Sequence, residues 1–261
     1  MAFIKEYWDK KKELTQTAQN HAKNMEQIYR KEILQAVSKT KKYNPNYNET
    51  KPIQTGYIDI KVEPLDSVAA VLKYTKETEG KTAVLNFSSY KHPGGMFLQG
   101  SKAQEECLCH ASFLYNVLSR MHDFYEWNNA HKNKALYLNC GLYSPNIAFF
   151  KDEAMVFCDV ITCAAPNKSA AQKYCNVSDE ENYDTLKSRI QFVLDIAADN
   201  QVDTLILGAY GCGVFGQNPK EVSEIFKEYL TTSHTCFKKV VFAIPDGKDG
   251  NYKMFLNTFN E

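Results

Sequence analysis

The sequence predicts an α/β protein in which a single β-sheet is covered by helices on both faces. Short, continuously apolar segments alternate along the chain with amphipathic segments of helical periodicity. A strand that is apolar on both sides must be buried on both sides, so this alternation is typical of sheets placed between helices. The 261 residues are 44% apolar and 24% charged, which is the composition of a folded globular protein.

The first 52 residues are expected to form a helical extension and a loop ahead of the α/β core. Between Thr17 and Thr40, apolar side chains recur at helical spacing and charged residues occupy the opposite face. A helix packed on the outside of the domain is the simpler interpretation, and a partner-binding helix is the alternative. Tyr43–Pro52 is rich in Asn and Pro, which predicts a loop. We expect one domain over residues 1–261, with the core at residues 53–261.

The core elements follow one another without an internal repeat or a low-complexity tract. The predicted strands are Tyr57–Val62, Thr82–Phe87, Ala154–Cys163, Thr204–Leu207 and Lys239–Ile244. The predicted helices are Leu65–Tyr74, Ser101–Arg120, Glu180–Ala198 and Asn218–Leu230. Asp66 and Asn218 stand at the start of two of these helices, where their side chains can accept hydrogen bonds from free backbone N–H groups.

The charge balance excludes two kinds of partner. Lys and Arg together number 31, as do Asp and Glu, so the formal charge is zero. Binding to nucleic acid through a basic face needs a surplus of cations, and so does binding to an anionic membrane surface. No apolar run is long enough to span a bilayer, and the first residues lack the apolar stretch of a signal peptide. An intracellular location is therefore expected, in the cytoplasm or, in a eukaryote, in the nucleus.

The eight cysteines do not predict a metal site. None of them forms a C-x-x-C pair, so free and mostly buried thiols in a reducing compartment are expected. Cys107, Cys109 and His110 lie close together in the sequence. Residues two positions apart on a helix point in different directions, so we expect no metal and no cofactor here.

Two glycine-containing loops follow predicted strands and carry the polar residues of interest. We call residues 86–106 the first glycine loop and residues 208–219 the second glycine loop. In an open α/β sheet, ligands bind where such loops leave the carboxyl ends of the strands. The first loop contains Gly95-x4-Gly100-Ser101-Lys102, in which Ser and Lys stand in the wrong order for a nucleoside triphosphate-binding loop.

The second glycine loop matches G-x-G-x-x-G from Gly211 to Gly216, between a strand and a helix. Glycines allow backbone N–H groups to approach a diphosphate, and the dipole of the next helix favours its negative charge. A tight turn without a ligand is the alternative. A nicotinamide oxidoreductase is disfavoured, because only about 50 residues follow and no acidic residue stands about twenty positions further on to bind a ribose.

Gln104-Glu105-Glu106 begin a predicted helix at the end of the first glycine loop. Simple enrichment of Glu in a first helical turn is one explanation. Adjacent side chains on a helix are rotated by about 100°, so both carboxylates cannot face one atom. If the pair is catalytic, one glutamate holds the substrate and the other transfers a proton.

The run N-F-S-S-Y-K-H-P-G-G-M-F-L-Q-G-S-K-A-Q-E-E resembles the signature of microbial-type poly(ADP-ribose) glycohydrolases. That signature combines an Asn at a strand end, a Pro-Gly-Gly-Gly loop and a Gln-Glu-Glu triplet. Further blocks occur in the order of the family, namely Ser112-x-Leu114-Tyr115, Tyr143-Ser-Pro, Val160–Asn167, Leu207–Gly216 and Val240–Ile244. Met96 replaces the third glycine of the loop, and it would strain or block the loop if that position needed a positive φ.

The resemblance implies a macrodomain-like three-layer α/β/α sandwich with a central mixed sheet and an N-terminal helical extension. It implies that ADP-ribose binds over the strand ends, that Glu106 is catalytic and that Glu105 hydrogen-bonds the distal ribose. Asn86 would contact the same ribose, Gly94 and Gly95 would lie beside the diphosphate, and Phe215 would pack on the ribose. The implied binding residues are Asn86, Gly94, Gly95, Gln104, Gly211, Cys212, Gly213, Val214 and Phe215.

The implied activity is hydrolysis of ADP-ribosyl glycosidic bonds with release of ADP-ribose, and Glu106 is the general acid and base. The substrates would be poly(ADP-ribose) or ADP-ribosylated proteins, bound by a monomer without metal, cofactor, membrane or sequence-specific nucleic acid. An ADP-ribose-binding macrodomain that does not cleave its ligand is the alternative. Tyr143, Phe150 and Asn167 are candidates for the adenine side, although aromatic residues of α/β proteins more often pack in the core.

Overall fold

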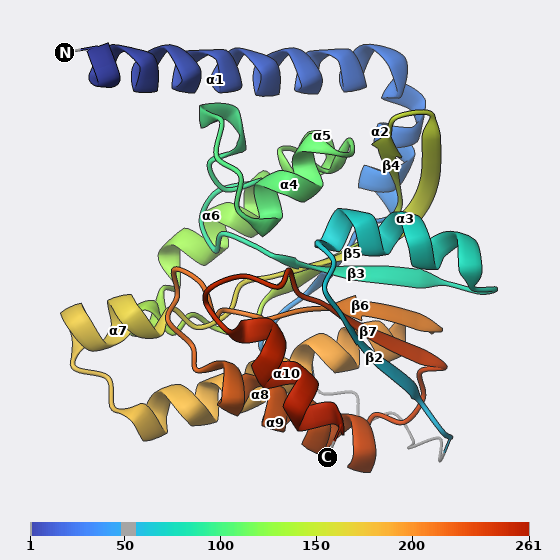
Figure 1. Ribbon diagram of the computed structural model, residues 1–261, viewed down its shortest axis with the longest axis vertical. Helices are drawn as coiled ribbons and strands as arrows, with labels where there is room; N and C mark the ends of the chain where they lie inside the picture. Colours follow the sequence, from blue (N-terminus) through green and yellow to red (C-terminus); the bar gives the residue numbers. More distant parts are fainter. Residues whose placement is uncertain (1, 48–55, 261) are drawn as a thin grey trace.

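The computed structural model describes residues 2–47 and 56–260 and shows a mixed sheet between two layers of helices (Figure 1). The seven strands have the order β1-β4-β5-β3-β6-β7-β2. Strands β5, β3, β6, β7 and β2 are parallel to one another, whereas β1, β4 and β5 pair antiparallel. Their bounds are β1 Lys41–Tyr43, β2 Asp59–Glu63, β3 Thr82–Phe87, β4 Gly141–Lys151, β5 Ala154–Cys163, β6 Thr204–Leu207 and β7 Lys239–Ala243.

Each face of the sheet has its own hydrophobic core, which confirms the predicted fold class. On the central strand β3, Val84 packs in one core, whereas Ala83 and Leu85 pack in the other. Successive side chains of a strand point to opposite faces, so a continuous apolar run is needed to fill both layers. The first core also contains residues of α1 Ala2–Ile28, α2 Arg30–Lys39, α3 Ser67–Glu77, α4 Gln104–His110, α5 Leu114–Leu118 and α6 His122–Ala130. The second contains residues of α8 Asp179–Asp199, α9 Pro219–Thr232 and α10 Asn251–Asn260.

The predicted helix starts are confirmed by their caps. The Asp66 side chain accepts a hydrogen bond from the N–H of Ala69 at 2.8 Å, and α3 follows it. Asn218 accepts from the N–H of Lys220 at 2.9 Å at the start of α9, with Pro219 in the first turn. Both side chains satisfy backbone donors that would otherwise lack a partner.

Two predicted elements are wrong in part. Ser101–Arg120 is not one helix, because α4 and α5 are separated at residues 111–113. There the N–H of Phe150 donates to the Ala111 carbonyl at 2.7 Å, and Ser112 bridges to Phe149. Pairing with β4 therefore replaces helical hydrogen bonds at the break. In Ala154–Cys163 only the second half is fully buried, since two side chains of the first half, Met155 and Phe157, are exposed.

The sequence analysis missed β1, β4 and the helices α6, α7 (Lys168–Cys175) and α10. Lys41–Tyr43, assigned to the extension and the start of the loop, pairs with β4 as an edge strand, and most of Tyr43–Pro52 lies outside the described residues. Pro145 and Asn146 interrupt the strand pattern of β4 in the sequence. At these residues the register of β4 with β5 shifts, and Asn146 has a φ of 55°. The Asp159 side chain holds this bulge by accepting from the Asn146 N–H at 2.7 Å.

The eight cysteines form no disulfide within the described residues, and four of them are buried: Cys109, Cys140, Cys158 and Cys163. None of the described helices combines the length and the apolar character that crossing a membrane would require.

We expect Arg189→Leu to destabilise the protein because the guanidinium of Arg189, on α8, is completely buried. Its Nε donates to Asn139 Oδ1 at 2.7 Å, and the guanidinium also donates to the Ala164 carbonyl. Leucine would remove the donor of the half-buried Asn139 oxygen and of the buried Ala164 carbonyl, which should lower the free energy of unfolding by about 3 kcal/mol. Urea unfolding measures the change. Lys187→Leu, two residues earlier in a surface ion pair with Glu228, is the control and should cost less than about 1 kcal/mol. Equal losses in the two variants would contradict the prediction.

Candidate functional site

Both glycine loops leave the same edge of the sheet. Strands β3, β5, β6 and β7 are parallel, and their last residues pair side by side, as in Phe87 with Cys163 and Leu207 with Phe242. The first glycine loop runs from the end of β3 to the first turn of α4, and the second follows the end of β6. The topology therefore places the predicted site residues of both loops over one edge of the sheet, where open α/β proteins bind ligands.

Glu105 is buried in the first turn of α4, with 3% of its surface exposed. Its Oε2 accepts a hydrogen bond from the N–H of Ser89 at 2.6 Å, and its Oε1 accepts from Asn86 Nδ2 at 3.2 Å. Removal from water outweighs these hydrogen bonds and raises the pKa of Glu105 to about 8. Near neutral pH this carboxyl group is therefore mostly protonated.

Glu106 is also buried, but its two oxygens have different surroundings. Oε1 accepts a hydrogen bond from the backbone N–H of Met96 at 2.8 Å. Oε2 is inaccessible and has no hydrogen-bond partner among the described residues, as is also true of Asn86 Oδ1. Buried polar atoms without a partner are uncommon and costly, so these two oxygens are candidates for contact with a ligand or with water.

Both polar atoms of the Gln104 side-chain amide form hydrogen bonds within the protein. Its Oε1 accepts from the N–H of Phe87 at 2.9 Å, while Nε2 donates to the Leu85 carbonyl at 2.8 Å and to Ser67 Oγ at 3.0 Å. This side chain therefore joins the start of α4 to the end of β3 and to α3. It determines where the glutamate pair lies, which is a role the sequence analysis did not assign to it.

The first glycine loop comes very close to the glutamate pair at Gly95. A Cβ atom there would lie 2.5 Å from Glu106 Oε1 and 3.0 Å from Glu105 Oε2, and the residue has a φ of 58°. Gly94 has a φ of 67°, and a Cβ on it would lie 2.9 Å from the Tyr115 ring. Both positions thus require glycine. Met96 has a φ of −104°, so this position does not have the positive φ that would strain a methionine.

In the second glycine loop, the three glycines of the G-x-G-x-x-G motif lie in different surroundings. Gly211 and Gly216 have φ values of 77° and 72°, and a Cβ on either would clash with neighbouring side chains. Gly213 has no positive φ, and nothing lies within 4 Å of its would-be Cβ. On one side of Gly213, the side chain of Val214 is 89% exposed. On the other side, burial raises the pKa of the Cys212 thiol to about 12. The conformation of the turn therefore requires glycine at positions 211 and 216. No contact within the described residues requires a glycine at position 213.

A row of aromatic side chains connects the two glycine loops, and the sequence analysis found only one of them. The ring of Phe215 lies 6.3 Å from that of Tyr137, which in turn stacks on Tyr90 at 4.2 Å. Tyr90 belongs to the first glycine loop. Tyr137 has a φ of 64°, an unusual conformation for a bulky residue that tertiary packing must maintain. No pattern in the local sequence indicates this contact.

Two of the three candidates for the adenine side lie in the core instead. Tyr143 is buried, and its hydroxyl donates to Asp159. Phe150 packs on Tyr29, which is the N-cap residue of α2, and the two ring centroids are 4.9 Å apart. Asn167 accepts from the N–H of Ala170 at 3.0 Å and so caps α7. These contacts favour the alternative of core packing for both aromatic residues, and the adenine assignment stays a prediction.

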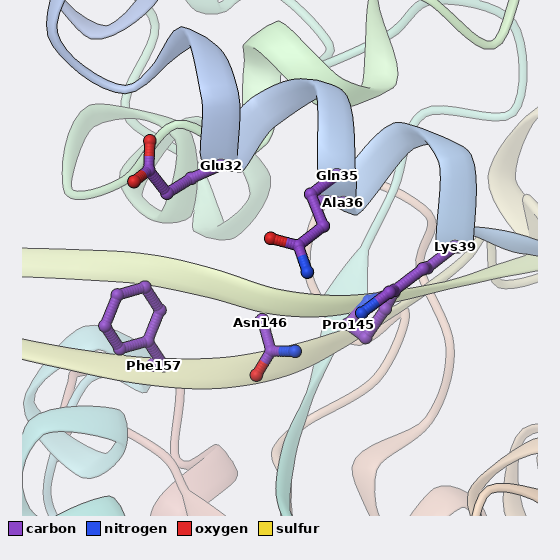
Figure 2. A pocket seen from close by; sticks show the side chains of 7 residues that line it. All are labelled: Glu32, Gln35, Ala36, Lys39, Pro145, Asn146 and Phe157. Carbon is purple, nitrogen blue, oxygen red and sulfur yellow. The ribbon is translucent and has the colours of Figure 1, made fainter.

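A separate hollow of about 250 Å³ lies between α2 and the β4–β5 hairpin (Figure 2). It is near the start of β5, whereas the glutamate pair lies beyond the ends of the parallel strands. It contains none of the predicted site residues. Its lining consists of Glu32, Gln35, Ala36, Lys39, Pro145, Asn146 and Phe157. The described residues include no group of three or more His, Cys, Asp or Glu side chains arranged to hold a metal ion.

The mixed sheet, its two helical layers and the loops over the strand ends define a macrodomain-like α/β protein. The chain belongs to the family described as "Microbial-type PARG, catalytic domain", whose model matches residues 10–152. The fold is similar to poly(ADP-ribose) glycohydrolase (PARG) from Thermomonospora curvata, with a TM-score of 0.85, 28% identity and coverage of 95% of this chain and 99% of that one.

Two solved complexes also resemble the chain. The Thermomonospora curvata enzyme bound to the inhibitor ADP-HPD matches with a TM-score of 0.82 at 28% identity, covering 94% of this chain and 98% of that one. The enzyme from Deinococcus radiodurans in complex with ADP-ribose matches with a TM-score of 0.80 at 30% identity, covering 87% and 96%. A search of curated proteins found no match.

The raised pKa of Glu105 predicts a pH-dependent stability. Its pKa is about 8 in the folded protein against 4.5 ordinarily, so folding favours the protonated form. The stability that this group contributes is present at low pH and is lost as the pH rises through about 8. Urea unfolding at about pH 5 and about pH 9 should show a smaller loss of stability for Glu105→Gln than for the wild type. An unchanged pH dependence in this variant would show that Glu105 is not the group responsible.

We expect Gly95→Ala to be strongly destabilising, because the new methyl group would meet both carboxylates at a positive φ. The free energy of unfolding should fall by about 1–3 kcal/mol. Gly213→Ala is the matched control, since nothing lies near its would-be Cβ, and its stability should equal that of the wild type. Thermal and urea unfolding of both variants provide the measurement. The account of the loop is wrong if alanine is tolerated equally at the two positions.

Proposed function

We propose that this chain hydrolyses the glycosidic bond at the anomeric carbon of an ADP-ribosyl group, with Glu106 as the general acid and base. The chain is an ADP-ribosyl glycohydrolase of the microbial PARG family, and two of its structural neighbours are complexes with ADP-ribose and with ADP-HPD. The observation that carries the residue assignment is the asymmetry of Glu106. One of its oxygens is held by the Met96 N–H, and the other has no hydrogen-bond partner in the part of the chain that the structure describes.

The two glycine loops are suited to a diphosphate. Gly94 and Gly95 present backbone from one side, and Gly211 to Phe215 present it from the other. Backbone N–H groups can bind an anion without cationic side chains, which agrees with a chain of zero net charge. No described residue other than its chain neighbours lies within 4 Å of the would-be Cβ of Gly213, and this open space supports the close approach of a ligand there. We include Cys212 and Val214 in this binding segment, with Phe215 packing on the distal ribose.

Asn86 and Glu105 would hold the distal ribose. The Oδ1 atom of Asn86 is unpartnered and can accept a hydrogen bond from a ribose hydroxyl. Glu105 is mostly neutral near pH 7 because burial raises its pKa to about 8. A neutral carboxyl group can hydrogen-bond the sugar without repelling the nearby diphosphate. We assign Gln104 to positioning this pair, since its amide is already bonded within the protein.

In the reaction, protonated Glu106 gives its proton to the departing glycosidic oxygen as the bond between this oxygen and the anomeric carbon breaks. Positive charge then develops on the ribose ring, and the diphosphate nearby offsets it. A water molecule attacks the anomeric carbon, and ionised Glu106 takes its proton. The carboxyl group is thereby restored and ADP-ribose is released. Glu106 is favoured over Glu105 for this role because both oxygens of Glu105 already accept hydrogen bonds.

We propose poly(ADP-ribose) as the substrate, cleaved at its ribose–ribose bonds, because the structural neighbours are named for this activity. Mono-ADP-ribosyl groups on proteins are the second candidate, since they contain the same ADP-ribose unit. We further propose that residues 1–261 act as one catalytic domain and as a monomer.

Glu106→Gln should abolish most of the activity and leave binding intact. The amide keeps the size of the side chain but cannot supply the proton, so turnover of poly(ADP-ribose) should fall by roughly 10²–10⁴-fold. Calorimetric titration with ADP-ribose should give a Kd close to that of the wild type. Released ADP-ribose, quantified by chromatography, reports the turnover.

Glu126→Gln is the control, because Glu126 is an exposed glutamate on α6. It should retain full turnover. Undiminished release of ADP-ribose by Glu106→Gln would contradict the assignment of the catalytic residue. The same assay with peptides carrying one ADP-ribosyl group on Ser, Arg or Glu compares the two substrate classes.

A further inference from the structure

The long helix α1 packs directly on the first glycine loop. It lies along the outside of the molecule and contacts residues 97–99 of this loop as well as α5 (Figure 1). Gly100 ends the short helix η1 (Phe97–Gln99) with a φ of 77°, and a Cβ on it would lie 2.7 Å from Leu14 Cβ and 2.9 Å from the Thr15 nitrogen. The loop backbone therefore meets the backbone of α1 with no room for a side chain. Ala18, one turn further along α1, is completely buried.

The same face of α1 also contacts the segment that follows the catalytic pair. His21 Nε2 donates to the carbonyl of Ser112, in the break between α4 and α5, at 2.8 Å. Further along, Asn116 donates to the Ala22 carbonyl at 2.9 Å, and Arg120 pairs with Glu26 at 2.9 Å. Residues 14, 18, 21, 22 and 26 follow helical spacing, so this is one continuous face. This face of α1 therefore contacts both the first glycine loop and the segment that includes the α4–α5 break and α5.

Phe97 connects the packing of α1 to the backbone that holds Glu106. Its side chain is completely buried between the rings of His21 on α1, His110 on α4 and Tyr115 on α5. Phe97 follows Met96, whose N–H holds Glu106 Oε1, and the Phe97 N–H donates to the Gly94 carbonyl at 3.0 Å. A shift of Phe97 would therefore move the backbone group that holds Glu106.

We propose that α1 is a positioning element of the catalytic site: its contacts with Gly100, Phe97 and Ser112 hold the first glycine loop so that the Met96 N–H orients Glu106. This inference rests on the proposed role of Glu106. Catalysis requires the carboxyl group in one geometry, whereas ADP-ribose also contacts the second glycine loop and Asn86. Loss of α1 packing should therefore reduce turnover more than it reduces affinity.

The test compares Ala18→Asp with Gln19→Asp. Both variants add one negative charge to adjacent positions of α1, but Ala18 is buried in the contact and Gln19 is exposed. For Ala18→Asp we expect kcat on poly(ADP-ribose) to fall roughly 10–100-fold, with the Kd for ADP-ribose changed by less than about threefold. Amide hydrogen exchange at Met96 should become faster. Gln19→Asp should match the wild type in all three measurements.

Assays are run well below the melting temperature of each variant, so that loss of folded protein does not lower kcat. If Ala18→Asp does not fold, His21→Ala serves instead, since it removes a half-buried ring that contacts Phe97 and donates to the Ser112 carbonyl. A folded variant with faster exchange at Met96 but wild-type kcat would overturn the inference, and so would equal losses of kcat and affinity. A wild-type chain that releases no ADP-ribose would instead contradict the proposed function.

Discussion

The site depends on one hydrogen bond, from the backbone N–H of Met96 to Glu106 Oε1. It forms only because the first glycine loop can pass within van der Waals distance of two buried carboxyl groups, and this approach requires a residue without Cβ at Gly95. The hydrogen bond occupies one oxygen of Glu106, and the other has no partner within residues 2–47 and 56–260. A single backbone donor thus makes the two oxygens of a symmetric carboxyl group chemically distinct, which is what a directional proton donor needs.

Two adjacent carboxyl groups in a buried first turn are costly, and the fold offsets this cost in separate ways. Asn86 and the Ser89 N–H donate to Glu105, while the amide of Gln104 connects the turn to β3 and α3. Even so, burial dominates and raises the pKa of Glu105 to about 8. The neutral form of Glu105 would reduce repulsion from Glu106 once Glu106 has given up its proton, and from the anionic ligand that we propose. The same desolvation that destabilises the ionised pair therefore suits the site to a diphosphate.

The parts that could be predicted from the sequence are those whose cause is local. Strand β3 is apolar on both faces, and Asp66 and Asn218 cap the helices that they precede. The break at residues 111–113 could not be predicted, because a bond from Phe150, far along the chain, replaces the helical one. Strand β4 was missed because its bulge at Pro145 and Asn146 is held by Asp159 on β5. The role of Gln104 likewise appears only when β3, α3 and α4 lie together.

Met96 shows why a motif position has to be judged by its backbone and not by its residue type. The family pattern has glycine there, and a methionine would be strained if the position needed a positive φ. The positive φ values next to Met96 instead fall at Gly94 and Gly95, where glycine adopts them without strain, and Met96 at −104° contributes its N–H group. Its side chain is half exposed, so it is directed away from the carboxylates that lie against Gly95. The part of the third position that the site uses is therefore the backbone amide, which every residue except proline provides.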